Sequence, residues 1–154
     1  MLRGVRPTTG PAAVLASPLV TIVLLATDSD GLFNDVDAAL ASDETEVLRV
    51  RAGTDVIPVC RHKHPDLVIL DLQIGNMGGI ATCIAVKQEE ESDRLDQIPV
   101  ALLLDRSVDV FLAEQAGADG WLIKPVDSLR LRRLTLALLA GDTSFERSPA
   151  PTVG

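Results

Sequence analysis

Two aspartates and a lysine stand at the ends of apolar, strand-like runs of this chain. Asp28 follows LVTIVLLA and Thr27, Asp71 closes DLVILD, and Lys124 follows WLI. If these runs are parallel strands, their carboxyl ends meet at one edge of a sheet, and the three side chains converge there. Carboxylates suit Mg²⁺, a carboxylate such as Asp71 can attack phosphorus to form an acyl phosphate, and Lys124 would pair with the transferred oxygens. Taken singly, either aspartate could equally cap the helix that follows it.

The elements that must position these side chains alternate along the chain. Strands are predicted, mostly from continuous apolar runs, over Leu19–Ala26, Glu46–Val50, Asp66–Asp71, Ile98–Leu104 and Trp121–Ile123. Helices are predicted from helical spacing over about 31–42, from Thr54 as N-cap to His64, from Ile80 with Cys83 and Ile84 as its inner stripe, over Val108–Gln115, and over about Asp127–Ala140. This alternation predicts right-handed crossovers and a mainly parallel sheet, an α/β fold.

Composition and charge narrow the class of protein. The chain has 154 residues, 47% hydrophobic and 23% charged, which is typical of one globular domain and excludes wholesale disorder. Its 22 acidic and 14 basic side chains give a net charge of −8, which speaks against unaided nucleic-acid binding. Two cysteines, Cys60 and Cys83, are too few for a disulfide framework.

Both ends of the chain are predicted to lie outside the folded domain. Residues 1–18 read as a flexible leader and 141–154 as a flexible tail, so the domain spans 19–140. The apolar run 12–26 behind two arginines resembles a signal peptide, but Pro18 interrupts it and it is too short to span a bilayer. We therefore expect a buried strand there, in a cytoplasmic protein that contacts no membrane.

Three segments resemble the receiver domains of bacterial response regulators, the CheY-like proteins of two-component signalling. PDLVILDLQIGNMGG (65–79) is similar to their phosphorylation loop, IPVALLL (98–104) to their fourth strand, and AGADGWLIKPVD (116–127) to their lysine–proline segment. One such motif is weak, but three in order at matching spacing are specific. The resemblance runs from about Val20 to Ala140 and implies a doubly wound, flavodoxin-like sheet of five parallel strands, in the order 2-1-3-4-5 with helices on both faces.

The resemblance also implies roles for single residues. Asp71 is implied as the phosphoacceptor and Lys124 as the lysine that contacts the phosphoryl group. Asp28, Asp71 and the backbone carbonyl of Gln73 are implied as ligands of Mg²⁺. Trp121 stands at the family's switch aromatic, although simple packing would explain it equally well. The Lys–Pro peptide bond of this segment is cis in the family, which is uncommon enough to be a clean test.

Four positions depart from the family pattern. Thr27 stands where the family has a first acid after strand one, so metal binding should be weaker but not abolished. Leu104 replaces the Thr or Ser that ends strand four, and it has no hydroxyl to bond a phosphoryl group. Asp105 stands where a small residue is usual; its carboxylate could repel an incoming phosphate or supply the acid lost at Thr27. Gly75 replaces a proline, which should make its loop more mobile.

We therefore expect a stand-alone receiver domain, phosphorylated on Asp71 by a histidine kinase or phosphotransfer protein. Its output would be a phosphorylation-dependent contact with another protein, so it would not be an enzyme in the sense of turnover. The surface formed by 107–140 is the candidate for an output partner or a homodimer. Three arginines fall in it, as ion-pairing or merely solvated groups: Arg130, Arg132 and Arg133. The alternative is a pseudo-receiver, a binding module that works without phosphate.

A phosphatase is the main alternative from another class. TDSDGLFND (27–35) resembles the nucleophile motif of haloacid-dehalogenase-type phosphatases, with Asp28 as nucleophile and Asp30 as acid/base. This interpretation leaves Asp71 without a role and lacks a cap domain.

A zinc site from Cys60, His62 and His64 is a further alternative. On a helix, positions 60 and 64 share a face while 62 points elsewhere, and no fourth ligand is near in sequence. A polar helix end explains these residues more simply.

Overall fold

The computed structural model describes residues 19–142. The leader predicted at 1–18 lies outside the described residues, as does the predicted tail from residue 143 onward. The flexibility predicted for both ends therefore stays a prediction.

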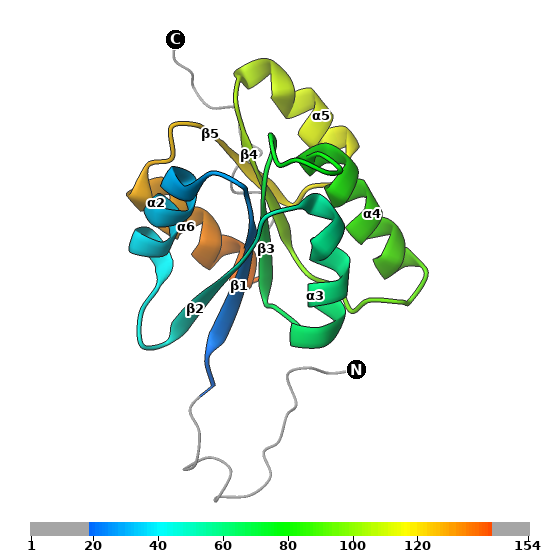
Figure 1. Cartoon of the computed structure of the whole chain (residues 1–154), viewed down its shortest axis with the longest axis horizontal. Coiled ribbons are helices and arrows are strands. Elements are labelled where there is room, and N and C mark those ends of the chain that lie inside the picture. Colours follow the sequence, from blue (N-terminus) through cyan, green and yellow to red (C-terminus); the bar gives the residue numbers. More distant parts are fainter. Residues whose placement is uncertain (1–18, 143–154) are drawn as a thin grey trace, which may run out of the picture.

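A single sheet of five strands forms the centre of the described part of the chain (Figure 1). Its strands are β1 (Thr21–Ala26), β2 (Thr45–Val50), β3 (Leu67–Asp71), β4 (Val100–Leu104) and β5 (Gly120–Ile123). All neighbouring pairs are parallel and the order is β2-β1-β3-β4-β5. The predicted fold class and strand order are confirmed, and each predicted strand has its counterpart.

Five α-helices between residues 19 and 142 cover both faces of the sheet. They are α2 (Asp30–Leu40), α3 (Val56–Lys63), α4 (Gly79–Glu91), α5 (Val110–Gln115) and α6 (Ser128–Leu139). Helices α2 and α6 pack on one face and α3, α4 and α5 on the other (Figure 1). Short 3₁₀ turns precede α3 and α5: η2 (Gly53–Asp55) and η3 (Ser107–Asp109).

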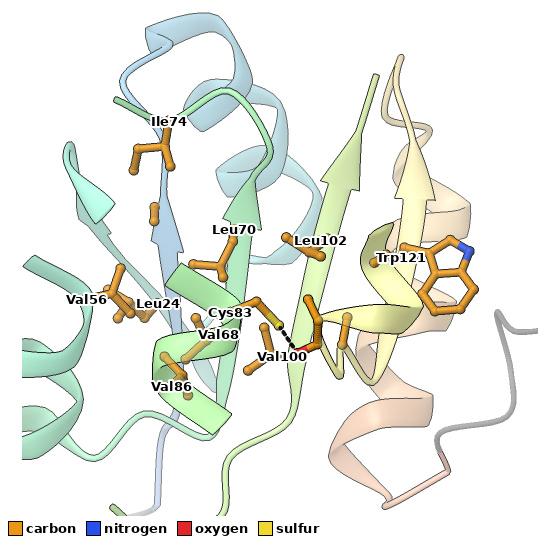
Figure 2. Packing of buried hydrophobic residues seen from close by; sticks show 14 of the residues in the cluster. Leu24, Val56, Val68, Leu70, Ile74, Cys83, Val86, Val100, Leu102 and Trp121 are labelled. Atoms are coloured by element: carbon orange, nitrogen blue, oxygen red, sulfur yellow. Dashed lines mark hydrogen bonds between the residues drawn. The ribbon is translucent and has the colours of Figure 1, made fainter. Parts of the chain in front are cut away.

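The central strands are apolar throughout because helices cover both of their faces. Every residue of β3 and β4 is buried, and alternate side chains enter opposite clusters. Leu70 and Leu102 belong to the cluster under α3, α4 and α5, whereas Ile69 and Leu103 face α2 and α6. Figure 2 shows the first cluster, with Cys83 of α4 in front of the strands. This packing holds the carboxyl ends of the strands in register.

Two details of the predicted helices are wrong. Thr54 is not an N-cap, because it lies inside η2 and α3 begins only after that turn. Ile84, predicted on the inner face of its helix, has a 40% exposed side chain. Cys83 is buried as predicted, but Thr82 and Val86 are the buried side chains beside it, so the helix is rotated relative to the predicted stripe.

The apolar run that resembles a signal peptide ends in a central strand. β1 lies between β2 and β3, and its last four residues are buried. The strand predicted for this run is therefore present. Among the helices described, none has the length and apolar character needed to cross a membrane.

Candidate functional site

Asp71 lies at the carboxyl edge of the sheet with both carboxylate oxygens engaged. It is the last residue of β3, and its side chain is only 3% exposed. Oδ1 accepts hydrogen bonds from Nζ of Lys124 (2.6 Å) and the backbone N–H of Gln73 (3.0 Å). Oδ2 accepts one from Oγ1 of Thr27 (2.7 Å). The parallel topology explains this meeting, because Thr27 follows β1 and Lys124 follows β5 at the same edge.

Thr27 is a buried polar residue that links β1 to Asp71. Its hydroxyl donates to Asp71 and accepts a hydrogen bond from the N–H of Ser29 (3.0 Å). Its carbonyl accepts one from Nε of Arg49 (3.0 Å). Because a hydroxyl has one proton to donate, the Thr27 proton is committed to the Asp71 carboxylate.

Lys124 joins Asp71 to a second carboxylate, that of Asp105. Nζ of Lys124 lies 3.0 Å from Oδ1 of Asp105, whose Oδ2 accepts a hydrogen bond from the side-chain amide of Gln73. The Gln73 amide, and then Lys124, hold the pKa of the Asp105 carboxyl below its ordinary value against partial burial. Burial opposes the charge of Lys124, but hydrogen bonds to Asp71 and Asp105 outweigh it and raise its pKa.

Asp28 supplies an exposed carboxylate beside the loop that follows Asp71. A Cβ added at Gly75 would lie 3.5 Å from Oδ2 of Asp28, so this carboxylate faces that loop. Together with Asp71 and the carbonyl of Gln73 it provides hard oxygens of the kind that Mg²⁺ prefers. The described residues contain no ready-made cluster of three His, Cys, Asp or Glu side chains for a metal. Oxygen donors of this type suit a magnesium ion that keeps several waters, and the assignment of these three residues as its ligands stays a prediction.

The loop between β3 and α4 is fixed by its neighbours. The N–H of Gly53 donates to the carbonyl of Gly75 (3.1 Å), and the Thr82 hydroxyl donates to the carbonyl of Met77 (2.7 Å). A Cβ at Gly53 would lie 2.2 Å from the Met77 oxygen, so glycine is required there. Met77 itself has a φ of 84°, whereas Gly75 does not adopt a positive φ. The greater mobility expected from Gly75 stays a prediction.

Leu104 and Trp121, the predicted switch positions, belong to the apolar cluster under α3, α4 and α5. Leu104 is fully buried and Trp121 is 5% exposed. Figure 2 shows the indole at the β5 side of the cluster. Leu104 contributes no donor to the site, whereas its backbone carbonyl accepts from the N–H of Lys124 (2.8 Å). The peptide bond between Lys124 and Pro125 is cis, as the resemblance implies.

Asp30, the acid/base of the phosphatase alternative, is held by two arginines of the β2 region. Its Oδ1 lies 2.9 Å from Nη1 of Arg49 and 3.1 Å from Nη2 of Arg51. These contacts, led by the hydrogen bond from Arg49, lower the pKa of the Asp30 carboxyl. A carboxyl with a lowered pKa is a poor proton donor, which disfavours this role.

The zinc alternative finds no support among the described side chains. Cys60 is buried, and burial raises the pKa of its thiol to about 12. His62 and His64 are exposed, and residues 19–142 contain no suitable cluster of ligands.

Sequence reasoning missed Arg49 as a contributor to this edge of the sheet. Besides Thr27 and Asp30, its guanidinium lies over the ring of Phe33, 5.1 Å from the centroid. A charged residue inside the strand TEVLRV was the available signal. The bond between the side chains of Gln73 and Asp105 had no such signal, because it depends on how two loops meet.

Comparison with known proteins identifies the class that this fold and site define. Residues 23–135 match the family model described as the response regulator receiver domain. The chain therefore belongs to the response regulator receiver family, whose members are signalling modules.

Similar curated proteins are longer regulators. The chain is 29% identical over 106 residues to the transcriptional regulatory protein AfsQ1 of Streptomyces coelicolor, covering 68% of this chain and 44% of that protein. It is 34% identical over 101 residues to the DNA-binding response regulator MtrA of Mycobacterium tuberculosis, covering 59% and 42%. The chain thus spans less than half the length of these two relatives.

Solved structures share the fold. A putative response regulator from Chloroflexus aurantiacus superposes with a TM-score of 0.71 at 23% identity, covering 79% of this chain and 98% of that one. The receiver domain of a signal transduction histidine kinase from Syntrophus aciditrophicus gives 0.70 at 26%, covering 88% and 99%. CheY4 of Vibrio cholerae gives 0.66 at 22%, covering 76% and 97%.

Proposed function

We propose that this chain is a phosphorylation-dependent signalling module that accepts a phosphoryl group on Asp71 from a histidine kinase or phosphotransfer protein. The observation that carries the proposal is the 2.6 Å contact between Nζ of Lys124 and Oδ1 of Asp71 at the carboxyl edge of the sheet. A carboxylate in this place is shielded from solvent and can act as a nucleophile. The adjacent ammonium of Lys124 can offset the negative charge of the incoming phosphoryl oxygens.

The transfer uses a carboxylate oxygen of Asp71 as nucleophile. An oxygen lone pair forms the bond to phosphorus, the bond from phosphorus to the donor's histidine nitrogen breaks, and its electron pair returns to the imidazole. Oδ2 accepts one hydrogen bond, from Thr27, where a carboxylate oxygen accepts about two. Oδ2 is therefore the oxygen with a lone pair to spare. Lys124 holds the oxygens of the transferred group.

Magnesium is the cation that this proposal requires. Asp28, Asp71 and the backbone carbonyl of Gln73 would hold it, with Thr27 contributing a neutral neighbour in place of an acid. Bound there, the ion would offset the charge of the phosphoryl oxygens. The missing acid should make the affinity for Mg²⁺ modest.

Output would pass through a protein contact on the 107–140 surface, in the cytoplasm, without turnover of a substrate and without contact to nucleic acid or membrane. Exposed apolar side chains support this surface: Val108, Phe111 and Leu136 are 62%, 64% and 67% exposed. Arg132 contributes less than expected, because its Nε donates to the carbonyl of Ala39 in α2. If Phe111→Ser left self-association or partner capture unchanged in the phosphorylated chain, another surface would have to serve.

A second candidate is the pseudo-receiver, and the burial of Leu104 favours it. The usual hydroxyl that couples a phosphoryl group to the aromatic is absent at Leu104, and both oxygens of the Asp71 carboxylate already accept hydrogen bonds, from Thr27 and Lys124. In that case partners would bind the unmodified domain, and Asp71→Asn would leave their affinity unchanged.

Beryllofluoride, a phosphoryl analogue that adds to carboxylates, separates the two candidates. We expect saturable, Mg²⁺-dependent binding, followed by calorimetry and by fluorescence of Trp121. Asp71→Asn should abolish it, whereas Asp66→Asn, at the opposite end of β3, should not. Absence of heat and of a fluorescence change with the wild-type chain would favour the pseudo-receiver.

A further inference from the structure

A closed ring of contacts at the carboxyl edge of the sheet joins four residues: Asp71, Gln73, Asp105 and Lys124. Lys124 contacts both Asp71 and Asp105 through Nζ, at 2.6 and 3.0 Å. Gln73 bridges the same two carboxylates from the other side, because its backbone N–H donates to Asp71 and its side-chain amide donates to Asp105. The ring therefore joins the loops that follow β3, β4 and β5.

The ring places a carboxylate where a bound phosphoryl group would compete for the same partner. A phosphoryl group on Asp71 needs the ammonium of Lys124. Asp105 and Asp71 already take two of the three hydrogens of that ammonium, and the Asp105 carboxylate balances its charge. Asp105 is directed to Lys124 and Gln73, which is not the position of the acid that Thr27 replaces beside Asp71. Of the two roles considered for Asp105, competition is the one that these contacts favour over metal binding.

We propose that Asp105 is an autoinhibitory residue that competes with the phosphoryl group for Lys124 and, with Gln73, closes the acceptor site. The inference rests on the proposed phosphorylation of Asp71. For transfer to occur, the Lys124–Asp105 contact opens and Asp105 turns outward to solvent. The incoming anion must displace the Asp105 carboxylate from the ammonium. This competition lowers the apparent affinity of the site for every anionic phosphodonor.

The ring can open without unfolding the core. The side chains of Asp105 and Lys124 are 29% and 25% exposed, and Gln73 is exposed, whereas Asp71 beneath them is buried. Opening therefore exchanges two polar contacts for hydration by water and leaves the apolar clusters intact. A contact at such exposure is weak enough to be displaced by a doubly charged phosphoryl group.

The test compares the initial rates of phosphorylation by acetyl phosphate in Mg²⁺, measured by intact mass over a range of donor concentrations. Asp105→Asn keeps the shape but removes the charge, Asp105→Ala removes the whole group, and Gln73→Ala removes only the bridging amide. Asp43→Asn, an exposed aspartate beside the start of β2, is the matched control for net charge. Urea unfolding of each variant verifies the fold.

We expect both Asp105 variants to lower the half-saturating donor concentration by about fivefold or more, with little change in the maximum rate. Gln73→Ala should act in the same direction but less, and Asp43→Asn should match the wild type. Unchanged or slower reaction of the folded Asp105 variants would overturn the inference while leaving the acceptor role intact. Absence of any adduct in every variant, with acetyl phosphate and with a purified phosphohistidine donor, would overturn the acceptor role and, with it, this inference.

Discussion

Thr27 donates a 2.7 Å hydrogen bond to Oδ2 of Asp71, and both residues are buried. The site thus has a neutral hydroxyl where the resemblance places an acid. Lys124 and Gln73 donate to the other oxygen, so both carboxylate oxygens accept hydrogen bonds from groups of the chain itself. These hydrogen bonds stabilise the site in the absence of ligands. A cation or a phosphoryl group that binds Asp71 must therefore compete with them.

Thr27→Asp should restore a magnesium site at a cost in stability. A second carboxylate would lie against Asp71 and the hydrogen bond would be lost, which should destabilise the metal-free protein by about 1–3 kcal/mol. Millimolar Mg²⁺ should then raise the melting temperature far more than in the wild type. Thr27→Val, which loses the hydroxyl without adding charge, is the control and should show no gain from Mg²⁺. An equal magnesium effect in the wild type and Thr27→Asp would count against this location of the cation.

Leu104→Thr should lower the stability of the fold and strengthen the coupling between an anion on Asp71 and the Trp121 side chain. The side chain is fully buried in the cluster that includes Trp121, so a smaller, polar residue should cost about 1–3 kcal/mol in urea unfolding. The new hydroxyl can donate to an anion on Asp71, so beryllofluoride should produce a larger change in Trp121 fluorescence. Leu104→Val, of similar size to threonine, serves as the control. If both variants responded alike, the hydroxyl would have no part in coupling.

Lys124→Met should weaken the fold because it leaves the Asp71 and Asp105 carboxylates side by side without their cation. The Asp71 side chain is 3% exposed, so we expect a loss of about 1–3 kcal/mol, reduced from that of a fully buried pair by the 25% exposure of the lysine. Lys63→Met, at an exposed site on α3, should change stability by less than about 0.5 kcal/mol. Equal free energies of unfolding for both variants would show that the ring contributes nothing to stability.

Cys60 and Cys83 should be unreactive in the folded protein and make it less stable in alkali. Burial raises the pKa of each thiol from 9.0 to about 12. The unfolded chain therefore loses thiol protons above pH 9 that the native chain keeps. It follows that the free energy of unfolding falls between pH 9 and pH 12.

Two measurements check the thiol prediction. A thiol reagent at pH 8 should label both cysteines in urea and neither in buffer, and the decline in stability above pH 9 should be shallower in a Cys60→Ala/Cys83→Ala double variant. Rapid labelling of the native protein would contradict the burial of these groups.

The strands could be predicted from the sequence because their environment is uniform. β4 is covered on both faces and is accordingly five apolar residues in succession, VALLL. Helix details were less predictable, since Ile84 and Thr82 compete for the inner face of α4 and only tertiary packing decides between them. The 3₁₀ turn at Thr54 has the same cause, because Gly53 must pack against the Met77 carbonyl.

Some contacts of the candidate site could likewise be predicted from the sequence, whereas others could not. Asp71 and Lys124 could be placed together because both stand at carboxyl ends of parallel strands, where the topology leaves little choice. The contacts of Gln73 and Asp105 could not, because each side chain sits on a loop and its direction depends on a partner distant in sequence. The sequence shows that Thr27 stands where the family has an acid. The hydrogen bond from its hydroxyl to Asp71, however, could not be predicted, because it depends on how β1 and β3 pack.

The most direct test of the central claim is the mass of the intact protein after incubation with acetyl phosphate and Mg²⁺, followed by peptide mapping of the adduct. We predict one phosphoryl group per chain, located on Asp71, absent from Asp71→Asn and present in Asp66→Asn. No adduct under these conditions and none with a purified phosphohistidine donor, or an adduct that persists in Asp71→Asn, would contradict the assignment of Asp71 as the phosphoacceptor.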